Sequence, residues 1–177
     1  MSYDFTPLVR SLHLAHKKFK EELRKIGYGF RKTEPEVVKQ TREAFWTALG
    51  NLFNELEKYE EGFLANERNA VDTIIGFLEI DVPAFRCGYA KEKYFRKLKS
   101  LDLNENQKER LRNLALKLCQ TDSYRREFRD LARLTIKLAD TDFIEKLKKL
   151  ERTTDEIVHF KVKMMLETIL QNRRDLR

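Results

Sequence analysis

Apolar residues recur along most of this chain with the spacing of one face of an α-helix. The pattern is clearest over 104–140, where it predicts two amphipathic helices joined by a polar break at 120–123. The apolar positions are Leu111, Leu114, Ala115 and Leu118 in the first helix and Phe128, Leu131, Ala132, Thr135 and Leu138 in the second. At about 100° per residue, the cations of the second helix fall roughly opposite its apolar stripe. This pair is therefore predicted to have one buried face and one positive, solvent-facing side.

The same periodicity predicts helices on both sides of this pair. We expect helices over 6–25, 35–59, 66–79 and 84–98, then a short helix ending near 150 and a last helix over 153–170. Thr33 with Glu36 and Thr153 with Glu156 have the spacing of capping boxes, which begin helices, and a break is expected at 60–62. The last helix is expected to bury Ile157, Phe160, Met164, Ile169 and Leu170.

Sparse glycine and proline favour an all-α fold of seven or so helices. Only six Gly and three Pro occur in 177 residues, which leaves few tight turns for a β fold. The chain is long enough for one well-filled core. The Asp-Val-Pro sequence at 81–83 is the best candidate for a boundary between an N-terminal helical subdomain, 1–83, and a basic C-terminal subdomain, 84–177. One continuous domain is the alternative.

The C-terminal part resembles a known kind of helical repeat. In DEIVHFKVKMMLETIL, which follows the short helix over 143–150, Asp155 precedes Val158, a basic residue and spaced leucines such as Leu166. This arrangement resembles the second helix of a HEAT-type repeat, and the resemblance covers 104–170. The segment lacks the usual proline of the first helix, and Phe160 and Met164 stand where small residues often pack. The resemblance implies a short HEAT-like, solenoid-like stack of helix hairpins that offers a binding surface and no chemistry.

Cysteine content and hydropathy indicate a soluble, cytoplasmic protein. Cys87 and Cys119 are too few for a disulfide framework or a zinc site, so we expect reduced, partly buried thiols. The N-terminus lacks the apolar core of a signal peptide. No apolar run approaches the roughly 18 residues of a membrane span.

The sequence contains only weak candidates for metal-binding or catalytic residues. His13 and His16 share a helix face but have no acidic or thiol ligand before Glu21. Glu156 and His159 form a single Glu-x-x-His pair, whereas a di-iron bundle needs two. Cys87 follows an arginine that could lower the pKa of a thiol, although such a cysteine is more often incidental. With no Gly-rich phosphate loop, we expect no catalytic residue, metal, cofactor or small-molecule substrate.

Charge is distributed unevenly along the chain. The net charge of +7 divides into +5 over 1–33, −7 over 34–83 and +9 over 84–177. A basic band in the C-terminal part comprises Lys91, Lys93, Arg96, Lys97, Arg126, Arg129, Arg133 and Lys137. Such a band could neutralise phosphates of a nucleic acid. Equally, Glu127 and Asp130 lie among these arginines and could pair with them locally.

These patterns favour a non-enzymatic helical interaction module or scaffold. We expect it to bind a protein partner, with Trp46 and Phe53 on a flanking line of the second helix as contact residues. The alternative is a nucleic-acid-binding protein, or a subunit of a nucleoprotein complex, that uses the basic band. No membrane partner is expected.

Overall fold

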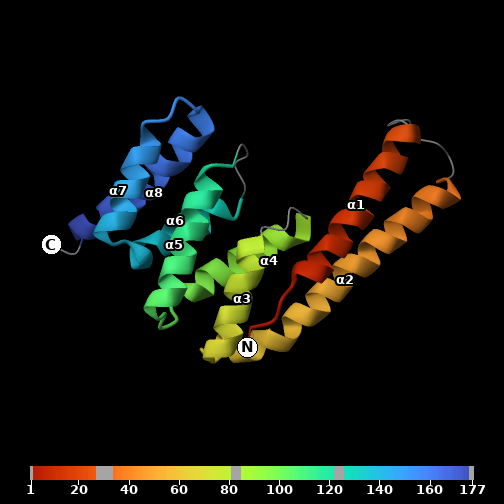
Figure 1. The fold of residues 1–177 in the computed structure, drawn as a ribbon, viewed down its shortest axis with the longest axis horizontal. Coiled ribbons are helices and arrows are strands. Elements are labelled where there is room, and N and C mark those ends of the chain that lie inside the picture. The colour runs from red at the N-terminus through yellow and green to blue at the C-terminus, as the bar shows by residue number, and fades with distance from the viewer. Residues whose placement is uncertain (1, 27–33, 81–84, 122–125, 176–177) are drawn as a thin grey trace. The chain divides into compact units, whose positions relative to one another are not determined.

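The computed structural model describes residues 2–26, 34–80, 85–121 and 126–175 (Figure 1). Within these ranges all regular structure is helical, which confirms the expected all-α class. The eight helices found there are α1 (Thr6–Ile26), α2 (Glu36–Leu64), α3 (Arg68–Ile80), α4 (Phe85–Leu98), α5 (Glu105–Cys119), α6 (Phe128–Leu138), α7 (Thr141–Glu151) and α8 (Glu156–Asp175). Two compact units result, Met1–Ile80 with α1 to α3 and Asp81–Arg177 with α4 to α8. The boundary expected at 81–83 lies outside the described residues.

The first unit is built on a long hairpin of α1 and α2, against which α3 packs through α2 (Figure 1). Its core contains Val9, Leu12, Leu49, Leu52, Leu56, Ile74, Ile75 and Phe77. The segment before α1 belongs to the same core, since Phe5 is fully buried with its ring 5.7 Å from that of Phe77. The backbone N–H of Tyr3 also donates to the hydroxyl of Thr73 at 3.2 Å. The N-terminal segment is thereby held against α3.

Helix α2 is longer than its sequence pattern predicted. The break expected at 60–62 is wrong, because the helix continues to Leu64. The chain turns at Asn66, whose φ of 63° lies in the left-handed region that asparagine adopts more readily than most residues. The backbone N–H of Glu67 donates to the carbonyl of Gly62 at 2.8 Å and closes this turn.

Helix α6 is the centre of the second unit. It packs against α4, α5 and α8, while α7 packs against α8. The apolar stripes predicted for α5 and α6 are buried, as the sequence pattern required. Because α5 also contacts α7, two successive helix hairpins lie against one another. None of the described helices, in either unit, is long and apolar enough to cross a membrane.

Side-chain caps begin several of the described helices, among them α5, α7 and α8. Asn104 and Gln107 form a capping box at α5, with bonds of 3.0 and 3.1 Å. Asp140 accepts from the backbone N–H of Phe143 at 2.7 Å at the start of α7. At α8 the expected box of Thr153 and Glu156 is wrong, because Asp155 accepts from the first backbone N–H groups instead. The box expected at Thr33 lies outside the described residues.

The buried face of α8 also differs from the prediction. Of the five residues expected in the core only Ile169 is buried, whereas Ile157, Phe160 and Leu170 are exposed and Met164 is half-buried. The buried residues are Val158, Lys161, Val162, Met165, Leu166 and Ile169. This face was missed because Lys161 interrupts its apolar pattern.

Lys161 is buried because it completes the end of another helix. Its Nζ donates to the carbonyls of Leu118 and Thr121 at 3.0 and 2.6 Å, and to the Thr121 hydroxyl at 2.8 Å. The ammonium also lies 5.6 Å from the ring centre of Phe128. The carbonyls at the C-terminal end of α5 thus receive a donor from α8, in addition to the Thr121 hydroxyl, which donates to the carbonyl of Leu118 at 2.9 Å.

Candidate interaction surfaces

Four of the predicted basic residues gather around one pocket of the second unit. The pocket has a volume of about 430 Å³ and is lined by Glu92, Arg96, Arg126, Arg129, Asp130 and Arg133. We call this group the arginine pocket. Glu92 and Arg96 come from α4, Arg126 directly precedes α6, and the others lie on α6. The packing of α4 against α6 therefore brings together residues more than 30 positions apart in the chain.

Two buried carboxylates hold the arginines in place. Arg96 donates through Nη2 to Glu92 and through Nε to Asp130, at 3.0 Å in each case. Arg126 Nε lies 2.7 Å from the second oxygen of Glu92. The Glu92 and Asp130 side chains are only 7% and 6% exposed, whereas Arg96 and Arg126 are more than half exposed. The carboxylates thus form the base of the cluster and the guanidinium groups its outer surface.

The remaining arginines of the pocket are less constrained. Arg133 Nη1 lies 3.7 Å from Asp130 Oδ1, an ion pair without a hydrogen bond. Arg129 is exposed and makes no ion pair with any residue in the described parts of the chain. The guanidinium of Arg126 lies 4.9 Å from the ring centre of Tyr89, which is half exposed. The pocket therefore has donors that are not used within the described structure.

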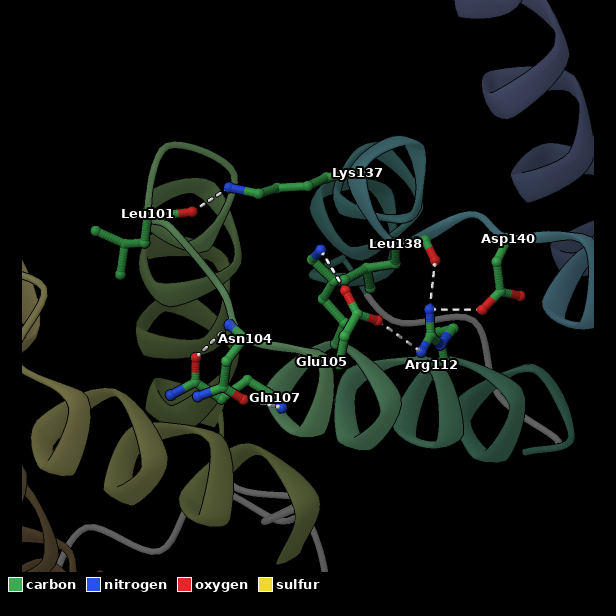
Figure 2. A network of polar contacts seen from close by, with 9 residues as sticks. Leu101, Asn104, Glu105, Gln107, Arg112, Lys137, Leu138 and Asp140 are labelled. Carbon is green, nitrogen blue, oxygen red and sulfur yellow. Dashed lines mark hydrogen bonds and ion pairs between the residues drawn. The ribbon is translucent and has the colours of Figure 1, made fainter.

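The lysines of the predicted band lie elsewhere. Lys91 is 1% exposed and belongs to the interior, so it is not placed to contact a phosphate at the surface. Lys93 is exposed and Lys97 half-buried on α4. Lys137 donates to the carbonyl of Leu101 (Figure 2) and to that of Lys99, both of which follow α4. Burial lowers the pKa of Lys137 below its usual value.

Figure 2 shows a second cation, Arg112 of α5, at the C-terminal end of α6. Arg112 Nη1 lies 2.7 Å from Asp140 and donates to the carbonyl of Leu138 at 3.2 Å. Arg112 and Lys137 therefore serve the loops around α5 and α6. Both cations therefore stabilise the fold by binding backbone carbonyls, a role that their positions in the sequence did not indicate.

The predicted protein-contact residues lie on one side of α2 in the first unit. Trp46 is 47% exposed and Phe53 is half-buried. At 100° per residue, Gly50 lies between them on the same side of the helix. Around the position that a Cβ of Gly50 would take, the described structure has open space for 4 Å. We call Trp46, Gly50 and Phe53 the aromatic face.

Trp46 is supported by a row of rings at the interface of α1 and α2. Its indole lies 5.2 Å from the ring of Phe45, in an edge-to-face arrangement. Phe45 stacks on Phe19 of α1 at 6.1 Å and lies 5.2 Å from His16. The Trp46 side chain is thus an exposed aromatic group packed against a fixed neighbour.

Other groups considered for chemistry are poorly placed for it. Cys87 and Cys119 are both fully buried free thiols, and burial raises their pKa values to about 11 and about 12. A nucleophilic cysteine requires a shift in the opposite direction. Across the described ranges, no group of three or more His, Cys, Asp and Glu side chains could hold a metal ion. His159 instead lies 2.9 Å from the carbonyl of Glu151.

Sequence reasoning missed several members of these surfaces. Glu92 was not assigned a role, although it joins two arginines, and Gly50 was not noticed. The sequence signal that could have identified Gly50 is its place in the middle of a helix, four residues after Trp46 and three before Phe53. The sequence matches no known family model, no curated protein and no solved structure.

Proposed function

We propose that this chain is a non-enzymatic α-helical interaction module that binds a protein partner through the aromatic face of α2. The observation that carries the proposal is the open space beside Gly50, between Trp46 and Phe53. A glycine in a helix interior costs about 1 kcal/mol relative to alanine. Since no neighbour in the described structure requires a small residue at this position, close approach of a partner is a physical reason for it.

The chemistry around the aromatic face indicates the kind of partner. Trp46 combines a large contact area with few rotatable bonds, as residues that dominate binding energies do. Glu43 and Glu57 are exposed and lie about one turn beyond Trp46 and Phe53, on the same side of α2. A helix with an apolar row flanked by basic residues would complement this surface in shape and charge.

The finer architecture that we infer for the second unit is a short HEAT-like stack. Its support is that the hairpin of α5 and α6 lies against that of α7 and α8, with α5 contacting α7 and α6 contacting α8. Helical stacks of this kind commonly act as binding scaffolds. A cytoplasmic location is part of the proposal, and the two free, buried cysteines fit a reducing compartment.

Comparative affinity purification from the native cell tests the protein-binding proposal. We expect partners captured by the wild-type chain to be lost with Trp46→Ala and with Gly50→Gln, which fills the open space. Leu170→Ala is the matched control, because Leu170 is also 47% exposed but lies on α8. Recovery of the same partners in the same yield with all four proteins would contradict the proposal. Size-exclusion chromatography with light scattering would identify a second copy of the chain as the partner.

Nucleic-acid binding is the second candidate. It is favoured by Arg126 and Arg133, which are 69% and 57% exposed, and by exposed Arg129 beside them. It is weakened by Glu92 and Asp130, because these carboxylates already neutralise part of the arginine charge. The protein-binding proposal does not depend on these residues.

A further inference from the structure

We propose that the arginine pocket binds a phosphomonoester in its dianionic form. This site lies in the second unit and is independent of the aromatic face of α2. The six described residues that line the pocket are all charged, and its volume of about 430 Å³ is in the usual range of small-molecule sites, about 300 to 1,000 Å³. The ligand is therefore expected to be recognised by charge and hydrogen bonds.

The pocket is organised before any ligand arrives. Arg96 joins the two carboxylates, with 3.0 Å bonds to Glu92 and to Asp130, and Arg126 is held on Glu92 at 2.7 Å. Both carboxylates are at least nine-tenths buried; both oxygens of Glu92 are paired with arginines, whereas Asp130 accepts through Oδ2 alone. Because these guanidinium groups are already held in place in the free protein, less side-chain conformational entropy is lost when a ligand binds.

The charges of the pocket match those of the ligand. Four arginines and two carboxylates leave a net charge of +2, and a phosphomonoester carries close to −2 at neutral pH. Arg129 has no ion pair with described residues, and Arg133 has only the long contact of 3.7 Å to Asp130. Each guanidinium has five N–H donors, so these two can turn most of theirs toward an anion.

The arrangement favours a terminal phosphate over the backbone of a nucleic acid. A monoester offers three terminal oxygens at one point, which can accept from several arginine forks at once. A phosphodiester carries one negative charge for each phosphate and distributes its charge along a strand. Four guanidinium groups around a single pocket suit the concentrated dianion.

Isothermal titration calorimetry of the full chain with phenyl phosphate, at constant ionic strength, tests this site. We expect one site per chain, at least tenfold weaker affinity for the diester dimethyl phosphate, and about tenfold or greater weakening by Arg129→Gln or Arg133→Gln. Arg129→Gln is the most informative variant, because it leaves both buried carboxylates with their present partners. Lys148→Gln, which removes the same charge from an exposed position on α7, should change the affinity by less than about twofold.

An oligonucleotide with and without a 5′-phosphate distinguishes the sources of the monoester. If the 5′-phosphate raises the affinity for the oligonucleotide and Arg129→Gln abolishes this increase, the site is supported and its ligand is a nucleic-acid end. If phenyl phosphate binds but the 5′-phosphate does not raise the affinity for the oligonucleotide, the ligand is a small molecule. Tighter binding of both oligonucleotides than of phenyl phosphate, with no effect of the 5′-phosphate, would overturn the proposal in favour of backbone binding. Absence of phenyl phosphate binding at millimolar concentration, or equal weakening by Lys148→Gln, would also overturn it.

Discussion

Single side chains decide which surfaces of the second unit are buried. Lys161 is the clearest case, since lysines are almost never fully buried unless their charge has partners. Its three donors instead satisfy two carbonyls and one hydroxyl at the end of α5. Lys161 therefore lies on the buried face of α8 with five apolar residues, whereas Ile157 and Phe160 are exposed.

Replacing Lys161 should therefore destabilise the protein. Lys161→Met keeps the apolar stem but removes the ammonium that donates to the carbonyl of Thr121 and is one of several donors to the carbonyl of Leu118, which should lower the free energy of unfolding by about 1 to 3 kcal/mol. Lys163→Met, at an exposed position two residues away, should change it by less than about 0.5 kcal/mol. Urea unfolding followed by circular dichroism measures both. Similar small effects of the two substitutions would show that the contacts of Lys161 contribute little.

At the scale of the helix, the sequence predicted where most helices begin and end. The predicted range 6–25 corresponds to α1, and the stripes of α5 and α6 are buried as expected. Errors are concentrated where local signals compete. A break was expected at 60–62, after a helix ending near Tyr59, but α2 continues to Leu64 and packs against α3. Likewise Asp155 and not Thr153 caps α8. Asp and Thr are both favoured at the N-cap, so the sequence did not distinguish between them.

The two glycines of α2 make a matched prediction about this helix. Gly50→Ala should raise the free energy of unfolding by about 0.5 to 1 kcal/mol, because it improves helix propensity in open space. Gly62→Ala should lack this gain, since its new methyl would lie 2.6 Å from Glu67 Oε2 and 3.1 Å from the Cβ of Ala70. Glu67 is flexible, but Ala70 lies on α3 and moves only with that helix. Thermal unfolding of both variants checks this, and equal stabilisation would contradict the close packing at Gly62.

If Gly50→Ala raises the free energy of unfolding and Gly50→Gln abolishes partner binding, Gly50 lowers stability but is needed for binding. If Gly50 were instead needed for packing within the chain, Gly50→Ala would lower the free energy of unfolding. The aromatic face is then an example of a sequence choice that costs stability and is explained by an interaction outside the molecule.

At the scale of the whole molecule, net charge is a poor guide to the surface that a partner meets. The segment 84–177 carries +9, yet Lys91 is buried, Lys137 serves backbone carbonyls, and Arg96 is paired twice. A basic band in the sequence thus becomes one compact pocket and several structural contacts.

We therefore expect weak binding of nucleic acid by the intact protein. Single-stranded RNA, single-stranded DNA and duplex DNA without terminal phosphates should bind no tighter than about 10⁻⁵ M near physiological salt, because Glu92 and Asp130 already neutralise part of the arginine charge that would release counterions. Fluorescence anisotropy at low and physiological salt measures this. Micromolar or tighter binding that falls steeply with salt, and is lost when Arg126, Arg129 and Arg133 are changed together to Glu, would establish the second candidate instead.

The sequence by itself determined the all-α class, most helix ranges and the buried stripes of α5 and α6. These features depend on helix propensity and on apolar periodicity within about 20 neighbouring residues, so they can be read locally. Only the tertiary structure decided the buried face of α8 and the assembly of the arginine pocket. Arg96 and Asp130 are 34 residues apart, and Lys161 and Leu118 are 43 apart. No local pattern encodes such pairs, because they form only when separate helices pack and leave polar groups that must be satisfied.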